Sequence, residues 1–240
     1  MIGIIGFGRF GRLAAQYLAR DVNVLVFARS GKRVEIEAVG AGAASFEEVC
    51  AQPTILLCVP ISTIEKTLRE ISPHLNRNSL VVDVCSVKEL PVQWMERHLP
   101  GEVSYLPTHP MFGPDSADTS LDGRKIVLCR GRVDAIRYEN IKSWLVSKGL
   151  VIIETTAAEH DRKIAVSLGL THFIGRALEK FGAGPLDIDT EGYKRLLHIL
   201  DVVQNDTIEL FRDMHTYNPH ARDARDRFAD AMSEVDRLLR

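Results

Sequence analysis

The chain lacks the features that mark several special classes of protein. Its 240 residues carry a formal net charge of only −2, so no excess of positive charge attracts nucleic acid or an anionic membrane. No apolar run reaches the roughly 18 residues that a membrane span requires. The four cysteines form no CxxC pair, and no metal site is expected. We therefore expect neither nucleic-acid nor membrane partners.

The cysteines are typical of a reducing compartment. Cys58, Cys85 and Cys129 lie inside apolar runs, as buried thiols do. Met1 already belongs to the first expected strand, so we expect no targeting segment and a cytoplasmic location. With 45% hydrophobic and 26% charged residues, the composition is that of an ordinary globular protein of one large or two modest domains.

What the chain does have is a glycine motif near its start. An apolar run, Met1–Ile5, leads into Gly6-Phe7-Gly8-Arg9-Phe10-Gly11, then a helical stretch and a second apolar run, Val22–Phe27. In this pattern the first glycine permits a tight turn, the second lets the backbone approach a pyrophosphate, and the third lets the helix pack closely. The helix N-terminus then faces the phosphates. The pattern predicts a dinucleotide-binding βαβ unit with all six motif residues at the cofactor; the alternative is a chance glycine turn.

An acidic residue is missing where an NAD-selective site usually has one, at the end of the second strand. No Asp or Glu occurs from Val22 to Val34, and the polar side chains that follow the strand are Arg29, Ser30, Lys32 and Arg33. Guanidinium and hydroxyl groups suit a 2′-phosphate, and each charge-assisted hydrogen bond is worth about 1.5–3 kcal/mol. We expect NADP as the cofactor, with NAD as the alternative. The other interpretation of these residues is a solvated basic loop.

Up to about residue 155, β-like runs alternate with helical segments, which predicts an α/β domain with a doubly wound, mostly parallel Rossmann-type sheet. Further strands are expected at Thr54–Val59, Leu80–Val84, Lys125–Cys129 and Leu150–Glu154, and helices at Ser62–Leu75 and Ala135–Ser147. The segment His109–Gly123 has no periodicity and predicts a long functional loop.

After Glu154 the strand signals stop. A long helix is expected at Glu159–Phe181, apolar nearly all round in its middle, and further helical stretches at Thr190–Met214 and Pro219–Leu239. The chain thus predicts a dinucleotide-binding domain over 1–155 and an all-helical domain over 156–240. We expect the second domain to bind substrate and to form a homodimer; a self-contained helical cap is the alternative.

Ligands of such sheets bind outside the carboxyl ends of the strands, where strand order reverses. Three loops at those ends carry candidate groups. In the first loop, Val59 and Pro60 are expected beside the nicotinamide ribose. In the second, Ser86 and Lys88 follow a buried strand, and Lys88 is expected at the cofactor. In the third, His109 precedes a proline. Histidine is a natural general base for alcohol oxidation because its ordinary pKa is near neutrality. We expect His109 to be that base and Ser86 to bind the substrate hydroxyl; a structural loop histidine is the alternative.

Taken together, the motifs resemble those of the prephenate/arogenate dehydrogenases of tyrosine biosynthesis, and most closely the plant-type arogenate dehydrogenases. The matching stretches span nearly the whole chain in the family's order: Gly3–Gly11, Val82–Glu89, Thr108–Pro114, His160-Asp161, Thr171–Lys180 and Tyr217–Pro219.

The resemblance implies an NAD(P)-dependent oxidative decarboxylation of arogenate, prephenate or both. His109 would take the proton of the 4-hydroxyl while hydride leaves the same carbon, and loss of CO2 yields the aromatic ring. Ser86 matches a serine that bridges hydroxyl and histidine, and Thr171 and His172 match a substrate-contacting segment. An arginine motif that holds a substrate carboxylate in many bacterial members is absent, and the candidates for that cation are Arg176, Lys194 and Arg195.

Two other functions fit the sequence. A β-hydroxyacid or imine reductase of similar architecture would use a lysine early in the long helix, where Lys163 is the only candidate. A non-enzymatic NADP sensor would keep the cofactor motif alone, because fold does not dictate function.

Overall fold

The chain folds into two compact units, Met1–Ala157 and Ala158–Arg240, in a computed structural model that describes all residues from 1 to 240. The first unit holds the whole sheet, and the second contains helices only. No helix is both long enough and apolar enough to cross a membrane.

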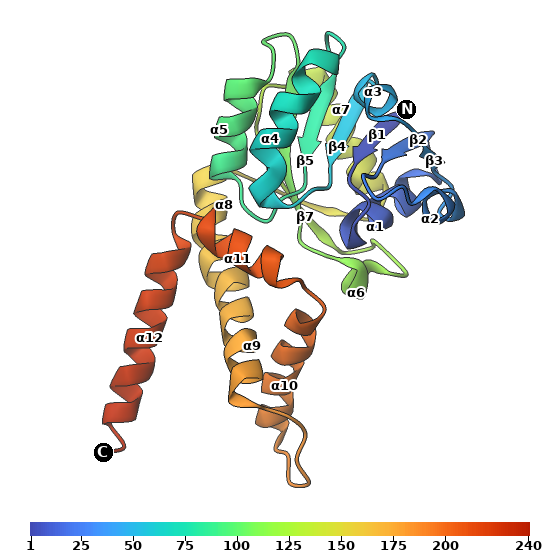
Figure 1. Ribbon diagram of the computed structural model, residues 1–240. Coiled ribbons are helices and arrows are strands. Elements are labelled where there is room, and N and C mark those ends of the chain that lie inside the picture. Colours follow the sequence, from blue (N-terminus) through green and yellow to red (C-terminus); the bar gives the residue numbers. More distant parts are fainter. The chain divides into compact units, whose positions relative to one another are not determined.

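The sheet of the first unit has eight strands in the order β3-β2-β1-β4-β5-β6-β7-β8 (Figure 1). All neighbours up to β6 pair in parallel, β7 runs antiparallel to β6, and β8 is parallel to β7. The predicted doubly wound, mostly parallel sheet is confirmed. The strands are β1 Ile2–Ile5, β2 Val24–Phe27, β3 Gly42–Ala43, β4 Thr54–Leu57, β5 Leu80–Asp83, β6 Ser104–Pro110, β7 Lys125–Cys129 and β8 Val151–Thr155.

The strand order reverses between β1 and β4. From β1 the chain builds outward through β2 to β3, then crosses back and continues from β4 to β6 on the other side. Ile5 stands opposite both Phe27 and Leu57, so β1, β2 and β4 end at the same level. This reversal places the ligand crevice of the fold at the carboxyl end of β1.

Helices cover both faces of the sheet. In Figure 1, α4 and α5 lie side by side over the near face, and α7 lies behind it. The helices are α1 Arg9–Leu18, α2 Arg33–Ala38, α3 Phe46–Cys50, α4 Ile61–Ile71, α5 Glu89–His98, α6 Pro114–Ala117 and α7 Ala135–Ser147, with a 3₁₀ turn at Ser72–His74.

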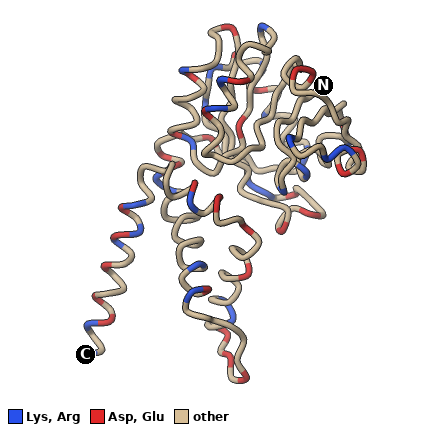
Figure 2. The backbone as a smooth tube through the Cα atoms, in the orientation of Figure 1, with Lys and Arg blue, Asp and Glu red and all other residues tan.

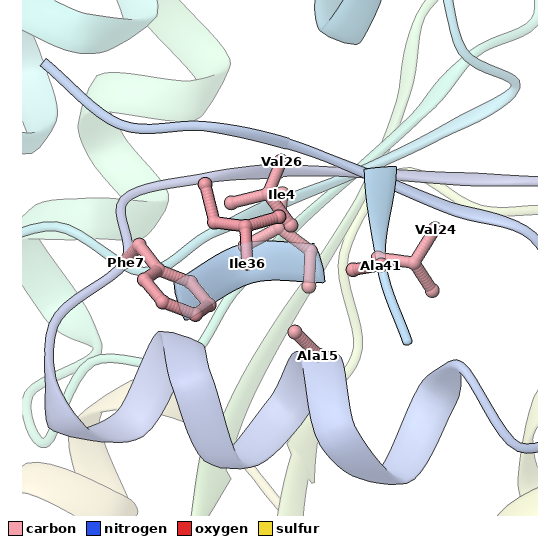
Figure 3. Close-up of a cluster of buried hydrophobic side chains, with 7 residues drawn as sticks. All are labelled: Ile4, Phe7, Ala15, Val24, Val26, Ile36 and Ala41. Atoms are coloured by element: carbon pink, nitrogen blue, oxygen red, sulfur yellow. The ribbon is translucent and has the colours of Figure 1, made fainter. Parts of the chain in front are cut away.

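A cluster of buried apolar side chains fixes α1 against β1 and β2 (Figure 3). Removing such side chains from water stabilises the fold by about 25 cal/mol per Å² of apolar surface. The cluster therefore holds the start of α1 at the end of β1. Its members are Ile4, Phe7, Ala15, Val24, Val26, Ile36 and Ala41.

Strand β6 was not predicted from the sequence. It carries Pro107 and Pro110, which hide its strand character because proline cannot donate to a sheet ladder. The strand changes partner along its length: Ser104–Pro107 pairs with β5, and Thr108–Pro110 pairs with β7. The expected long loop at His109–Gly123 is wrong at its start, because His109 lies in β6, and it also contains the short helix α6.

The second unit consists of helices α8 Ala157–Ile164, α9 Leu170–Phe181, α10 Glu191–Gln204, α11 Ile208–Thr216 and α12 Ala221–Arg237. The expected single helix at Glu159–Phe181 is interrupted by a π-helical turn, Ala165–Gly169. The expected stretch Thr190–Met214 is two helices, because the Thr207 side chain accepts from the Leu210 N–H and caps a new helix.

Helices α9 and α10 pack closely where α9 has a glycine. A Cβ on Gly175 would lie 2.5 Å from Cγ2 of Val203. Helix α12 has a different character, since charges of both signs alternate along it (Figure 2). Pairs such as Arg222–Asp226 and Asp223–Arg227, four residues apart, support its exposed faces.

The glycines of the N-terminal motif give a matched pair of substitutions. A Cβ on Gly11 would lie 2.2 Å from the carbonyl oxygen of Gly6, whereas a Cβ on Gly8 would meet nothing within 4 Å. We expect Gly11→Ala to lower the free energy of unfolding by about 1–3 kcal/mol through overpacking. Gly8→Ala should lower it by less than about 1 kcal/mol. Urea denaturation compares the two, and equal losses would contradict this account.

Candidate active site

The three motif glycines have three different environments. Gly6 has a φ of +103°, and a Cβ there would lie 2.2 Å from the carbonyl oxygen of Cys58. Gly11 allows α1 to pass against the turn, and Gly8 borders open space. This division matches the requirements of a dinucleotide site: a tight turn, an open approach for the pyrophosphate, and close helix packing. The residues present therefore fit a dinucleotide.

The start of α1 is suited to an anion. The helix begins at Arg9, right after Gly8, with neither a side-chain cap nor an acidic residue in its first turn. The first N–H groups and the positive end of the helix dipole favour a phosphate there. Phe7 was expected at the cofactor, but its side chain belongs to the buried core, so only its backbone can face the turn.

Two contacts join the first turn of α1 to the segment that follows His109. The Arg9 guanidinium donates to both carboxylate oxygens of Asp115, at 2.7 and 2.8 Å. The Phe10 ring contacts the Phe112 ring, with 6.3 Å between centroids. The segment beyond the candidate base is thus fastened to the candidate phosphate site.

The basic loop after β2 lies beside the glycine turn. The Gly6 N–H donates to Phe27 O at 3.0 Å, and Lys32 Nζ donates to Phe7 O at 3.5 Å. Arg29 and Ser30 are exposed, and Arg33 makes a long contact with Glu37 at 3.4 Å. The polar groups expected at a 2′-phosphate are therefore at the correct edge of the sheet.

The loop after β4 borders the crevice at the carboxyl end of β1, on the side opposite the loop after β2. The Cys58 N–H donates to Ile5 O at 2.8 Å, which fixes this loop beside the glycine turn. Val59 is half-buried and Pro60 is exposed before α4 begins. Burial raises the pKa of Cys58 to about 12, so its thiol stays protonated and is not a nucleophile.

Ser86 and His109 lie just beyond the carboxyl end of β5 and near that of β6. Asp83, the last residue of β5, stands opposite Pro107, so His109 is two residues past that level and Ser86 three. Oγ of Ser86 is buried and has no hydrogen-bond partner, so its hydrogen-bonding capacity is unused within the chain. His109 is buried, with 6% of its surface exposed. Both groups thus lie on neighbouring segments at one edge of the sheet.

Lys88 joins these two segments. Its Nζ donates to Oδ1 of Asp83 and, at 2.6 Å, to the carbonyl oxygen of Thr108. Thr108 Oγ1 donates to Asp83 O at 2.6 Å, and the Cys85 N–H donates to Asp83 Oδ1 at 2.9 Å. The residues before Ser86 and before His109 are therefore held by one buried network.

The expectation that Lys88 contacts the cofactor needs correction. The Lys88 side chain has no exposed surface, and its ammonium group points to Asp83 and Thr108. Lysine is almost never fully buried unless it is paired. Lys88 therefore supports the candidate catalytic segments from inside the sheet.

In the helical unit, the predicted substrate residues lie on α9. His172 is buried, and its Nε2 is 3.6 Å from Oδ2 of Asp206. Burial lowers the pKa of His172, which favours the neutral imidazole. Arg176 donates to Asp206 O at 2.5 Å and to Glu179 at 3.0 Å. Thr171 donates its hydroxyl back to Ser167 O at 2.6 Å.

The other candidate cations have different positions. Lys194 and Arg195 are exposed on α10, and Lys194 pairs with Glu191 at 2.7 Å. Of the three candidates, only Arg176 shares a helix face with His172, because the two are four residues apart.

A buried histidine and aspartate fix the start of the helical unit. His160 Nδ1 lies 2.7 Å from Oδ1 of Asp161, and Asn218 donates to Asp161 O at 2.8 Å. This last bond ties the segment before α12 to α8. The His160-Asp161 and Tyr217–Pro219 stretches, noted separately in the sequence, are thus in contact.

Comparison with known proteins agrees with this geometry. Residues 26–154 match the profile of the prephenate dehydrogenase nucleotide-binding domain, and residues 177–240 match that of a TYRAAT1-like C-terminal domain. Arogenate dehydrogenase 2 (chloroplastic) of Arabidopsis thaliana is 34% identical over 99% of this chain and 69% of its own length. Arogenate dehydrogenase 1 of the same plant is 35% identical over 99% of this chain, which spans 39% of that relative.

The chain belongs to the prephenate/arogenate dehydrogenase family. The family membership expected from the motifs is thereby confirmed. Solved structures of family members share its fold. A prephenate dehydrogenase from A. aeolicus, in complex with hydroxyphenyl propionate and NAD+, has a TM-score of 0.77 at 21% identity and covers 98% of this chain and 89% of its own. Synechocystis arogenate dehydrogenase has a TM-score of 0.72 at 23% identity, covering 99% and 91%.

Sequence reasoning missed two features of this prephenate/arogenate dehydrogenase family member. The pairing of Lys88 with Asp83 joins residues five apart around a loop, and only the shape of that loop brings them together. The Arg9–Asp115 pair joins residues 106 apart in the chain. The Asp83-x-x-x-x-Lys88 spacing beside an otherwise apolar strand was the one signal that could have indicated the first pair.

Removing the Lys88 charge tests the buried network. Lys88→Met leaves Asp83 buried without its partner, and we expect a loss of about 3–5 kcal/mol in the free energy of unfolding. The double variant Lys88→Met/Asp83→Asn, in which no charge stays buried, should lose less than the sum of the single losses. Chemical denaturation of the four proteins measures this coupling, and strict additivity would contradict the network.

Proposed function

We propose that this protein is an oxidoreductase that oxidises and decarboxylates arogenate, prephenate or both, with a nicotinamide dinucleotide as cofactor. One observation carries the proposal: Ser86 and His109 are held by one buried network at the carboxyl edge of the sheet, the edge that also carries the glycine turn. Membership of the prephenate/arogenate dehydrogenase family supports it.

The reaction needs one proton transfer and one hydride transfer from the same carbon. When bound, the nicotinamide ring supplies the hydride acceptor. His109 takes the proton of the 4-hydroxyl as hydride leaves C4, and the ring carboxylate is lost from C1 as CO2. The proton returns to the phenol oxygen. Because aromatisation drives the step, the protein mainly aligns the reacting atoms and assists the proton.

Ser86 orients the reacting hydroxyl of the substrate. The unpartnered Ser86 hydroxyl hydrogen-bonds the substrate hydroxyl and keeps its oxygen aligned with the base. In the helical unit, the residues proposed for substrate binding are Thr171, His172 and Arg176, all on α9. Arg176 is the preferred cation for a substrate carboxylate, because its Nε is buried and has no partner.

We further propose NADP as the preferred cofactor. The loop after β2 offers exposed Arg29 and Ser30 beside the glycine turn, with Lys32 and Arg33 following. No carboxylate stands at the end of β2 to receive a ribose 2′-hydroxyl, because the next residue is Ala28. The NAD+ in the A. aeolicus complex belongs to that protein.

The alternative reductase has less support. Lys163, its candidate catalytic lysine, has 70% of its side chain exposed and pairs with Glu159 at 3.1 Å. A solvated, paired lysine is a poor proton donor at a reacting centre. A non-enzymatic NADP sensor would have no use for the buried network that positions the segments of Ser86 and His109.

A homodimer through the helical unit is also proposed. Large apolar side chains there are strongly exposed, among them Phe181 (82%), Ile188 (87%), Leu238 (83%) and Leu239 (84%). Association with a second copy would remove such side chains from water.

The cytoplasmic location stays a prediction. All four cysteines are free, in keeping with a reducing compartment, but the Arabidopsis relatives are chloroplastic.

His109 gives the direct test of the reaction. We expect His109→Ala to lower kcat by about 10²–10⁴, since general-base catalysis contributes about that much, with unchanged cofactor affinity. Spectrophotometric NADPH formation from arogenate and from prephenate measures it, with exposed His198→Ala as control. Near-normal turnover by His109→Ala would rule out His109 as the general base. Absence of turnover of either substrate by the wild type would refute the proposed function.

Arg29 tests the cofactor preference. We expect Arg29→Ala to raise the KM for NADP by about tenfold or more and to leave the KM for NAD nearly unchanged, because only NADP carries the 2′-phosphate. Arg77→Ala is the matched control, since Arg77 is exposed on the same unit, away from the glycine turn. An equal change for both cofactors would argue against a 2′-phosphate contact.

A further inference from the structure

The segment that follows the candidate base leaves the sheet and lies against α1. Its first residue is still held by the sheet, because the Met111 N–H donates to Lys125 O of β7 at 2.9 Å. Beyond that bond, side chains of α1 reach the rest of the stretch Met111–Ala117, which we call the 111–117 segment. The three contacts are Arg9 with Asp115, Phe10 with Phe112, and the Tyr17 hydroxyl with Ala117 O.

Two of these contacts involve buried or half-buried groups of the segment. Phe112 also packs against an apolar cluster that β6, β7 and α7 share. Ala117 is buried, and the Tyr17 hydroxyl donates to its carbonyl oxygen at 2.8 Å. The Arg9 and Asp115 side chains are different, with 43% and 55% of their surfaces exposed. An ion pair this exposed is weak on its own, so it holds the segment only loosely unless a second group restrains Arg9.

The first turn of α1 faces the candidate phosphate site with its backbone and the 111–117 segment with its side chains. Arg9 and Phe10 are the two residues between Gly8 and Gly11 of the glycine motif. The N–H groups of a first helical turn have no partner within the helix and favour a phosphate. The side chains of the same two residues contact the 111–117 segment. One helical turn therefore lines the phosphate site and contacts the segment that follows the base.

The charge of Arg9 acts on two anions when a dinucleotide is bound. A diphosphate at the start of α1 is repelled by the Asp115 carboxylate, because like charges at short range disfavour each other. The Arg9 guanidinium attracts both anions. Its Nη2 donates to Oδ1 and Oδ2 of Asp115, and a guanidinium has five N–H donors, so it can bind a second anion at the same time. A bound diphosphate then restrains Arg9, and Arg9 restrains Asp115.

We propose that Arg9 and Asp115 are positioning residues that couple the cofactor site to the segment after His109. A dinucleotide in the glycine turn restrains the 111–117 segment and so strengthens substrate binding beside His109. By thermodynamic linkage, the substrate strengthens dinucleotide binding by the same factor. Because hydride transfer needs both ligands in place at once, this coupling favours the complex that can react. The identity of the substrate rests on the proposed function, whereas the contacts do not.

The test is a pair of binding measurements on the full-length protein at low salt, where exposed charges are screened least. Isothermal titration calorimetry measures the Kd of 4-hydroxyphenylpropionate, a phenolic carboxylate that cannot react. The titration is done without dinucleotide and with saturating oxidised NADP or NAD, whichever binds more tightly. For the wild type we expect the dinucleotide to lower the Kd of the probe about tenfold, within the range of about 5- to 150-fold typical of coupled sites. The reverse titration should give the same factor.

Variants of the pair separate coupling from a loss of structure. Asp115→Asn should lose the coupling, yet it should bind the dinucleotide at least as tightly as the wild type, because a carboxylate that repels the phosphates is gone. Arg9→Met should lose the coupling and also bind the dinucleotide more weakly, and adding Asp115→Asn to it should recover part of that affinity. Asp115→Glu retains the charge and should keep most of the coupling. Glu102→Gln, which removes the carboxylate of an exposed ion pair with Arg77 on the same unit, is the control and should keep all of it.

Three results would overturn the assignment. They are a probe affinity in the wild type that the dinucleotide does not change, an unchanged coupling factor in Asp115→Asn, and weaker dinucleotide binding by Asp115→Asn. Turnover of arogenate or prephenate without coupling would overturn the role of the pair and leave the proposed reaction intact. Coupling in a wild type that turns over neither substrate would refute the proposed reaction and leave the role of the pair standing.

Discussion

The ammonium group of Lys88 lies inside the sheet, where no part of the side chain meets solvent, and is matched by the Asp83 carboxylate and the carbonyl oxygen of Thr108. An isolated charge at that depth would be strongly unfavourable, so the burial of this lysine depends on the register of β5 and β6. The pair therefore ties two strand ends together. Ser86 and His109 follow from those ends, and their positions depend on it.

The cofactor side of the first unit depends on glycines, which have no side chain. A methyl group at position 6 or 11 would collide with a backbone carbonyl oxygen, whereas position 8 borders open space. The tight packing at Gly6 and Gly11 holds the turn still, and the open side at Gly8 leaves its N–H groups accessible. Rigid support and an accessible face are both needed for a phosphate to be bound in one orientation.

Much of this arrangement could be predicted from sequence, and the exceptions have physical causes. The βαβ unit was predictable because its glycines, apolar runs and helix lie within thirty residues. Strand β6 was not, because proline cannot donate to a sheet ladder: Pro107 lies where the strand changes partners, and Pro110 is the last residue of the strand. The burial of Lys88 was hidden for a related reason. A lysine after a strand is normally exposed, and only the fold of the Asp83–Lys88 loop turns it inward.

The helical unit shows the same limit. Its motifs at 160–161 and 217–219 were visible in sequence, but their contact through Asn218 was not. The π-helical turn also escaped prediction, because its apolar residues continue the helical pattern on either side.

The most direct measurement of the central claim is a crystal structure with oxidised dinucleotide and a phenolic ligand bound. The account predicts a His109 ring nitrogen within about 2.6–3.2 Å of the ligand hydroxyl, directly or through one water. It also predicts Ser86 Oγ on the same hydroxyl and the Lys88–Asp83 pair intact. A His109 side chain directed away from the ligand, with Ser86 unengaged, would contradict the account.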